Sequence, residues 1–206
     1  MISKASDEKI LIRETFFSLQ GEGHFTGKSA FFIRFAGCDI GCTWCDTKDA
    51  WSTENSEAFS VSEIIEKSKA KKTDYVVITG GEPFLHNLDH LTNELKQLGK
   101  FIHIETCGAY VVGNALFDWL SLSPKKIIPP KAENYKYARE LKVIVQDISD
   151  IEFAEQEKAK VSNKCIFYLQ PQWEKAEVVL PMIIEYITEH PEWQLSLQVH
   201  KYLHIQ

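Results

Sequence analysis

The segment from Tyr75 to Pro83 reads YVVITGGEP, an apolar run that ends in two glycines, a glutamate and a proline. The β-branched and aromatic residues at its start indicate a buried strand, and the paired glycines mark the turn that ends it. An apolar run followed directly by turn residues also occurs in FIHIETCG (residues 101–108), WLSLSPK (119–125) and CIFYLQP (165–171). Chemistry lies at the carboxyl ends of the strands in parallel β/α folds. We therefore predict an α/β fold with its functional groups along one edge of a parallel sheet.

Short apolar runs alternate with amphipathic helical stretches along the whole chain, as in βαβ units. Ser60 and Glu63 form a capping box that opens the first expected helix. Without an internal repeat or linker, residues 1–206 are expected to form a single domain. Strands are expected at 10–18, 30–35, 75–79, 101–105, 119–121, 141–145, 166–169 and 194–198, and helices at 61–70, 88–98, 151–160 and 176–189.

Composition narrows the class of protein. The formal net charge of −6 argues against a general nucleic-acid binder, which needs a basic face. No stretch approaches the roughly 20 apolar residues of a membrane span, and MISKASDEKI at the start lacks the apolar core of a signal peptide. Five cysteines, three of them within eight residues, suit a metal site better than a disulfide framework. A reducing cytoplasm is therefore the expected location.

Residues 36–47 read AGCDIGCTWCDT and place Cys38, Cys42 and Cys45 in a C-x3-C-x2-C array. Three thiolates can hold a metal centre, but they are one short of the four that close a tetrahedral zinc site or saturate a cubane cluster. The alternative is a structural zinc site whose fourth ligand is a histidine or one of the remaining cysteines, Cys107 and Cys165. Three cysteines on a cubane leave one iron open to an outside ligand.

Two residues in or next to the cysteine array, Trp44 and Thr47, each have two alternative roles. Trp44 either covers the metal from solvent or lies against a bound adenine. The Thr47 hydroxyl is a hard oxygen ligand suited to Mg2+, although a threonine after a metal loop is more often a local cap.

A polar turn, Gln20 to Gly23, separates two apolar strands near the start of the chain. Its glutamine and glutamate side chains can read the donor and acceptor edge of an aminopyrimidinone ring. Arg34 lies in an apolar run, which predicts a partner anion and a bidentate pair with a carboxylate. The alternative is a plain hairpin turn with Arg34 on the surface. The apolar tail LSLQVHKYLHIQ (195–206) predicts a docked segment that either packs or brings His200 and the Gln206 carboxylate to a pocket.

The cysteine array followed by TGGEP (79–83) resembles the signature of the radical S-adenosylmethionine (radical SAM) superfamily, whose open iron chelates SAM. SLQGEG (18–23), FIRFAGC (32–38), CDT (45–47), SPK (123–125), the QP turn at 170–171 and QVHKYL (198–203) occur in the order found in the 7-carboxy-7-deazaguanine synthase family. The resemblance covers nearly the whole chain. It implies an incomplete, TIM-like β/α barrel of the radical SAM type, commonly homodimeric.

The resemblance also implies an activity. A [4Fe-4S] cluster, SAM and Mg2+ would serve a carbon–nitrogen lyase of queuosine precursor biosynthesis, with flavodoxin as a suitable electron donor. SAM, cleaved to a 5′-deoxyadenosyl radical and re-formed, would drive ring contraction of 6-carboxy-5,6,7,8-tetrahydropterin to 7-carboxy-7-deazaguanine with loss of ammonia. The alternatives are an activase of glycyl-radical enzymes, for which the LQGEG turn would have no role, and a non-catalytic iron–sulfur or zinc module.

Carried over by position, the resemblance implies three sets of contacts besides the three catalytic cluster cysteines. Thr47 matches the Mg2+ ligand. The SAM contacts are Trp44, Cys45, Asp46, Gly80, Gly81, Glu82, Ser123, Pro124, Lys125, Gln170, Pro171, Gln172 and Trp173. The substrate contacts are Leu19, Gln20, Gly21, Arg34, Thr79 and Gln206, with Glu22 nearby and His200 added from the docked tail.

Overall fold

The computed structural model describes residues 9–54 and 56–206, so the expectation for the first eight residues lies outside the described part of the chain. The chain divides into two compact units. Of the described residues, the first comprises 9–18, Ser29–Glu105 and Val112–Asp118, and the second comprises Leu19–Lys28, Thr106–Val111 and Trp119–Gln206.

The first unit is built on the strands β3, β1, β2, β4 and β5, in that order across the sheet. β2, β4 and β5 are parallel, whereas β1 and β3 pair antiparallel. The bounds are β1 (Lys9–Leu19), β2 (Ser29–Phe35), β3 (Glu57–Ser60), β4 (Tyr75–Gly80) and β5 (Phe101–Thr106), with helices α1 (Val61–Ser68) and α2 (Asp89–Gln97).

The parallel strands of this unit form because their side chains are buried on both faces, as continuous apolar runs usually are. Val76, Val77 and Ile78 of β4 are fully buried, and α2 packs Leu91 and Leu95 into the same core. The capping box of Ser60 and Glu63 opens α1 as the sequence predicts. This packing fixes where the strands end, and therefore where the polar residues that follow them lie.

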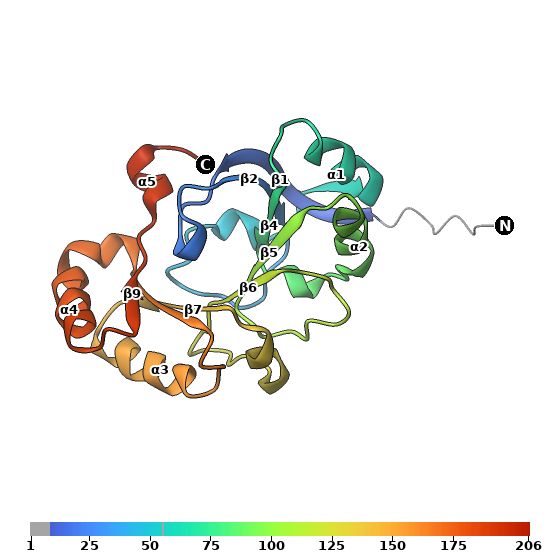
Figure 1. Cartoon of the computed structure of the whole chain (residues 1–206). Coiled ribbons are helices and arrows are strands. Elements are labelled where there is room, and N and C mark those ends of the chain that lie inside the picture. The colour runs from blue at the N-terminus through green and yellow to red at the C-terminus, as the bar shows by residue number, and fades with distance from the viewer. Residues whose placement is uncertain (1–8, 55) are drawn as a thin grey trace. The chain divides into compact units, whose positions relative to one another are not determined.

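The second unit contains four parallel strands in the order β6, β7, β8 and β9. Helices α3 and α4 lie beside β7, β8 and β9, and α5 follows β9 near the end of the chain (Figure 1). The bounds are β6 (Trp119–Leu122), β7 (Glu140–Val145), β8 (Ile166–Pro171), β9 (Trp193–Leu195), α3 (Ile148–Lys158), α4 (Ala176–Glu189) and α5 (Val199–Leu203).

Most expected elements are confirmed, and three differ. The strand expected at 194–198 covers Trp193–Leu195, residues 196–198 are in neither a strand nor a helix, and α5 begins at Val199. The sequence did not predict β3, because only one of its four residues, EAFS, has a large apolar side chain. α3 starts earlier than expected, because Asp147 caps it and completes a capping box with Asp150. In the part of the chain that the structure describes, no helix has both the length and the apolar character to span a membrane.

Glu155 on α3 makes contacts in the second unit whose contribution to stability depends on pH. Its carboxylate accepts hydrogen bonds from Trp193 Nε1 (2.6 Å) and the Tyr186 hydroxyl (2.8 Å). Burial raises the pKa of Glu155, but these hydrogen bonds and Lys158 outweigh it and lower the pKa below its usual value. A lowered folded pKa contributes stability above the unfolded pKa of about 4.3, and that stability is lost as the pH falls through the folded value.

Glu155→Gln should therefore lower the free energy of unfolding at pH 7 by on the order of 1 kcal/mol, allowing for the partial exposure of the side chain. The gap to the wild type should close as the pH falls from about 5 to 3. Urea denaturation at several pH values measures this, and exposed Glu152 on the same helix supplies the control variant Glu152→Gln. A gap independent of pH would rule out the charged form of Glu155 as its source.

Candidate active site

The three cysteines lie in a loop that follows β2 and is closed by backbone hydrogen bonds. The Gly37 N–H donates to the Ala50 carbonyl (2.8 Å), and the Cys38 N–H donates to the Trp51 carbonyl (3.2 Å). Gly37 and Gly41 have φ values of +99° and +71°, which other residues rarely adopt, so glycine is required for these bends. The loop therefore gathers the cysteines of residues 38–45 on a frame tied at both ends.

The thiols of this loop suit a cluster ligand set. Cys42 is buried and Cys38 and Cys45 are half-buried. Burial raises the pKa of the Cys38 thiol, and the nearby charges of Glu82 and of the other two thiolates raise it further. Crowded thiolates of this kind are stabilised by a bound cationic centre. The Thr47 N–H donates to Cys45 Sγ (3.4 Å), the type of contact that tunes iron–sulfur ligands. The donor set fits an iron–sulfur cluster with three protein ligands.

The glycine pair after β4 lies directly against the start of the cysteine loop. A Cβ on Gly80, whose φ is +130°, would lie 2.3 Å from the Phe35 nitrogen, and one on Gly81 would lie 2.0 Å from the Gly37 carbonyl oxygen. The N–H groups of Gly81 and Glu82 donate to the carbonyls of Phe35 and Gly37, each at 3.0 Å. The pair is thus required for close backbone contact, whatever role it has toward SAM.

Glu82 continues this turn as an almost fully buried carboxylate. It accepts from the Phe84 N–H (3.1 Å) and so caps the short helix that follows. His86 Nε2 lies 2.8 Å from the Ala36 carbonyl oxygen, which ties the same segment to the cysteine loop again.

Arg34, near the end of β2, lies between two polar partners. Its Nε donates to Glu14 Oε1 (2.9 Å), and its Nη1 lies 3.5 Å from Thr47 Oγ1. The Thr47 hydroxyl donates to Asp46 Oδ1 (3.1 Å). Arg34 has a partner anion, as the sequence predicts, but that anion is Glu14 of β1, which sequence reasoning missed. The contact with Thr47 links a potential carboxylate-binding fork to the cysteine loop.

Glu105 is a second residue that sequence reasoning missed. The Thr79 hydroxyl at the end of β4 donates to Glu105 Oε2 (2.9 Å) at the end of β5. The two strands are parallel neighbours, so their ends meet at the same edge. The sequence could have pointed to Glu105, because this carboxylate directly precedes the Thr106-Cys107-Gly108 turn.

In the second unit, the turn at Gln20–Gly23 is held together from within. Gln20 is buried, and its Oε1 accepts from the N–H groups of Gly21 (2.7 Å) and Glu22 (3.3 Å). The Glu22 carboxylate accepts from Lys142 Nζ and from Gln198 Nε2, the latter at 2.9 Å. The Gln20 and Glu22 side chains are therefore positioned by hydrogen bonds, as a site that reads a planar ring edge requires.

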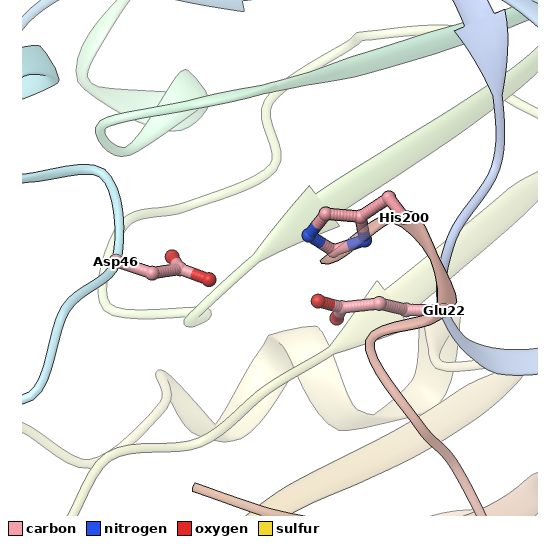
Figure 2. Close-up of side chains that lie close together, drawn as sticks. All are labelled: Glu22, Asp46 and His200. Atoms are coloured by element: carbon pink, nitrogen blue, oxygen red, sulfur yellow. The ribbon is translucent and has the colours of Figure 1, made fainter. Parts of the chain in front are cut away.

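The C-terminal segment docks on this turn. The Val199 N–H donates to the Gly21 carbonyl (2.9 Å), and a Cβ on Gly21 would lie 2.1 Å from His200 Nδ1. Figure 2 shows the Glu22 carboxylate and the His200 ring side by side, with a ligand atom of each within 4.8 Å of the other. Beyond His200, Tyr202 and Leu203 are more than half exposed, although the Tyr202 ring contacts the Trp173 ring edge-on with centroids 5.1 Å apart. The roles of His200 and Gln206 toward a substrate stay predictions.

The strand-end residues of the second unit make local contacts. Lys125 Nζ donates to Ser123 Oγ (2.7 Å), and the Ser123 N–H donates to the Thr106 carbonyl (2.8 Å). Gln170 is buried and accepts from the Ser196 hydroxyl (2.6 Å), while Gln172 caps the short helix after it. These contacts give each residue a structural role, and their SAM contacts stay predictions.

The expected site residues fall into two sets, one in each unit. The first unit holds Arg34, Cys38, Cys42, Trp44, Cys45, Asp46, Thr47, Thr79, Gly80, Gly81 and Glu82; the second holds Leu19, Gln20, Gly21, Glu22, Ser123, Pro124, Lys125, Gln170, Pro171, Gln172, Trp173, His200 and Gln206.

Cys165, a possible fourth zinc ligand from the sequence, is buried in the second unit. Burial, together with the nearby charge of Glu140, raises the pKa of its thiol to about 12.

Comparison with known proteins assigns this site to a class. Residues 32–125, which contain the cysteine loop and the glycine turn, match the model of the radical SAM superfamily. The chain therefore contains a radical SAM domain, as the array indicated.

Its relatives narrow the class to one family. The chain is 44% identical over 204 residues to a 7-carboxy-7-deazaguanine synthase of Flavobacterium psychrophilum, covering 99% of this chain and 96% of that protein. It is 46% identical over 195 residues to the Synechocystis protein of the same name, covering 95% and 93%. The crystal structure of QueE from Escherichia coli is 32% identical, with a TM-score of 0.84 over 93% of this chain and 95% of that one.

The chain belongs to the 7-carboxy-7-deazaguanine synthase family. The fold class is likewise confirmed as an incomplete β/α barrel of the radical SAM type. The activase and the zinc module are not favoured.

Proposed function

We propose that this chain converts 6-carboxy-5,6,7,8-tetrahydropterin to 7-carboxy-7-deazaguanine with release of ammonia. One observation carries the proposal besides family membership. The Thr47 N–H contacts Cys45 Sγ at 3.4 Å, and the Thr47 hydroxyl lies 3.5 Å from Arg34 Nη1. The guanidinium of Arg34, which can bind a substrate carboxylate, is thus linked through Thr47 to Cys45, a proposed cluster ligand.

Cys38, Cys42 and Cys45 would hold a [4Fe-4S] cluster, and the glycine turn with Ser123–Lys125 and Gln170–Trp173 would contact SAM. When bound, cluster and SAM supply a one-electron cleavage that generates a hydrogen-abstracting radical. The chain's own residues orient the substrate. Glu14 fixes the guanidinium of Arg34 through Nε, so that a carboxylate can dock on the remaining edge. Gln20, Glu22 and Thr79 would bind the pterin ring.

Thr47 is the proposed Mg2+ ligand. A threonine hydroxyl is a neutral oxygen ligand, so Mg2+ here would keep water and take substrate oxygens as further ligands. The adjacent guanidinium favours an anionic substrate between the two cations. We propose in addition that the enzyme is a cytoplasmic homodimeric lyase, formed from a single domain, that accepts electrons from a flavodoxin-type donor, as the resemblance implies.

The function is tested by anaerobic reconstitution with iron and sulfide, followed by incubation with SAM, dithionite, MgCl2 and the carboxytetrahydropterin. We expect the deazaguanine chromophore and ammonia, with less product when Mg2+ is chelated. Zinc in place of iron, with no SAM cleavage, would overturn the enzyme proposal. SAM cleavage without product would favour the activase instead.

Arg34 provides a prediction within this proposal. Arg34→Lys should raise the KM for the pterin about tenfold and Arg34→Ala about a hundredfold, because a lysine keeps the charge but loses the bidentate fork. Steady-state kinetics measure this. Arg13→Ala is the control, since Arg13 forms an exposed pair with Asp49 (3.0 Å) in the same unit, and such pairs contribute little. Equal KM changes in Arg13 and Arg34 variants would contradict the assigned role.

A further inference from the structure

β7 carries two buried charged residues beneath the Gln20–Gly23 turn. Glu140 is fully buried and Lys142 is 6% exposed. Charged side chains are almost never buried to this extent without dedicated partners. Both lie on one strand two residues apart, so their side chains leave the same face. Their partners show what the pair does.

Glu140 is bonded to the backbone of the turn. Its Oε2 accepts from the His24 N–H at 3.0 Å, and its Oε1 accepts from the Ser121 hydroxyl at 3.0 Å. The Trp119 indole N–H lies 3.4 Å from Oε2, and the Trp119 ring stacks on the His24 ring with centroids 4.9 Å apart. A carboxylate is suited to this position because its two oxygens accept several donors at once.

The turn packs closely against Glu140 on one side and bonds to Ser196 on the other. Gly23 has a φ of +64°, and a Cβ there would lie 2.1 Å from Glu140 Oε1, so the backbone lies directly on the carboxylate. The Gly23 N–H donates to the Ser196 hydroxyl (3.0 Å), which fixes the other side. Lys142, on the same face of β7, binds the Glu22 carboxylate.

We infer that Glu140 is a positioning residue for substrate binding: it fixes the Gly21–His24 backbone on β7 so that Gln20 and Glu22 are held ready for the substrate ring. The inference rests on the proposed function, because it takes this turn as part of the substrate site. Glu140 acts through the turn and touches no substrate. Loss of its carboxylate removes the acceptor of the His24 N–H and should loosen the turn.

The test compares Glu140→Ala with Glu157→Ala in the reconstituted full-length enzyme. Glu157 is the matched control, a buried glutamate in the same unit that accepts from the Tyr135 hydroxyl (2.6 Å) and from Lys160 (2.6 Å). Amide hydrogen exchange of peptides covering residues 19–28 and the KM values for pterin and SAM are measured. Both variants should lose thermal stability.

Only Glu140→Ala should raise exchange in residues 19–28 and raise the pterin KM, each by about tenfold, since a hydrogen bond to a charged acceptor contributes about 1.5–3 kcal/mol. Its KM for SAM should change less than about twofold. Glu140→Gln should restore both readouts, because its amide oxygen can accept from His24 while its NH2 donates to Ser121 Oγ.

Unchanged exchange in Glu140→Ala, or equal changes in Glu157→Ala, would overturn the inference. If Glu140→Ala does not fold, Glu140→Asp carries the same test, because its shorter carboxylate withdraws from the His24 N–H. Failure of the proposed function is distinguishable, since then the wild type makes no product while the exchange measurement still reports on the turn.

Discussion

Cys42→Ser should abolish SAM cleavage and product formation, by at least about 10³-fold, while leaving the fold in place. The hydroxyl of serine is a much poorer ligand for iron than a thiolate, and the cofactor carries the radical chemistry. Cys42 lies in a loop whose ends are closed by backbone hydrogen bonds at Gly37 and Cys38, which the substitution leaves intact. Iron and sulfide content, the absorbance of the reconstituted protein and the yield of cleaved SAM measure the effect.

Cys165→Ser is the matched control for this experiment. Cys165 is buried in the second unit and its thiol remains protonated at neutral pH, because burial raises its pKa to about 12. The control variant should bind the full complement of iron and cleave SAM. Retention of a cluster and of activity in Cys42→Ser would contradict the assignment of the cysteine loop.

Gly80→Ala should destabilise the protein by about 3 kcal/mol or more. A Cβ at this position would lie 2.3 Å from the nitrogen and 2.4 Å from the oxygen of Phe35, both backbone atoms of a buried neighbouring strand. Backbone atoms of a sheet have no rotamer by which to withdraw, and the φ of +130° adds a strain of about 1–3 kcal/mol for alanine. The midpoint of urea denaturation measures the loss.

Gly99→Ala separates the two contributions. Gly99 also has a positive φ, +72°, but nothing lies within 4 Å of a Cβ there. Its alanine variant should lose only the conformational cost of about 1 kcal/mol. Equal destabilisation at Gly80 and Gly99 would mean that close packing against Phe35 is not what the TGGEP turn requires.

The strands were predictable because burial on both faces requires continuous apolar runs. Val76, Val77 and Ile78 of β4 form such a run. The end of the chain was not predictable in the same way. Residues 194–198 alternate as a strand would, yet β9 ends at Leu195, since the Val199 N–H bonds to the Gly21 carbonyl and α5 begins there. A contact with residues far earlier in the chain overrides the local pattern.

The candidate site likewise has one part that the sequence predicts and one part that it does not. The cysteines and the glycine turn were predictable because their spacing is local and their chemistry demands specific residue types. The charged residues that support the Gln20–Gly23 turn were not predictable, because their partners are remote in sequence: Glu140 lies 116 residues from His24, and Lys142 lies 120 residues from Glu22. A buried charge inside an apolar strand such as ELKVIV was the available signal.

We propose that this chain uses its three-cysteine loop for radical chemistry at C6 of a carboxytetrahydropterin. The test is to incubate the reconstituted protein, under reducing conditions, with substrate deuterated at C6 and unlabelled SAM. We expect formation of 7-carboxy-7-deazaguanine and the appearance of deuterium in SAM recovered from the reaction. Product-free cleavage of SAM, or an intact cluster with no deuterium transferred, would contradict it.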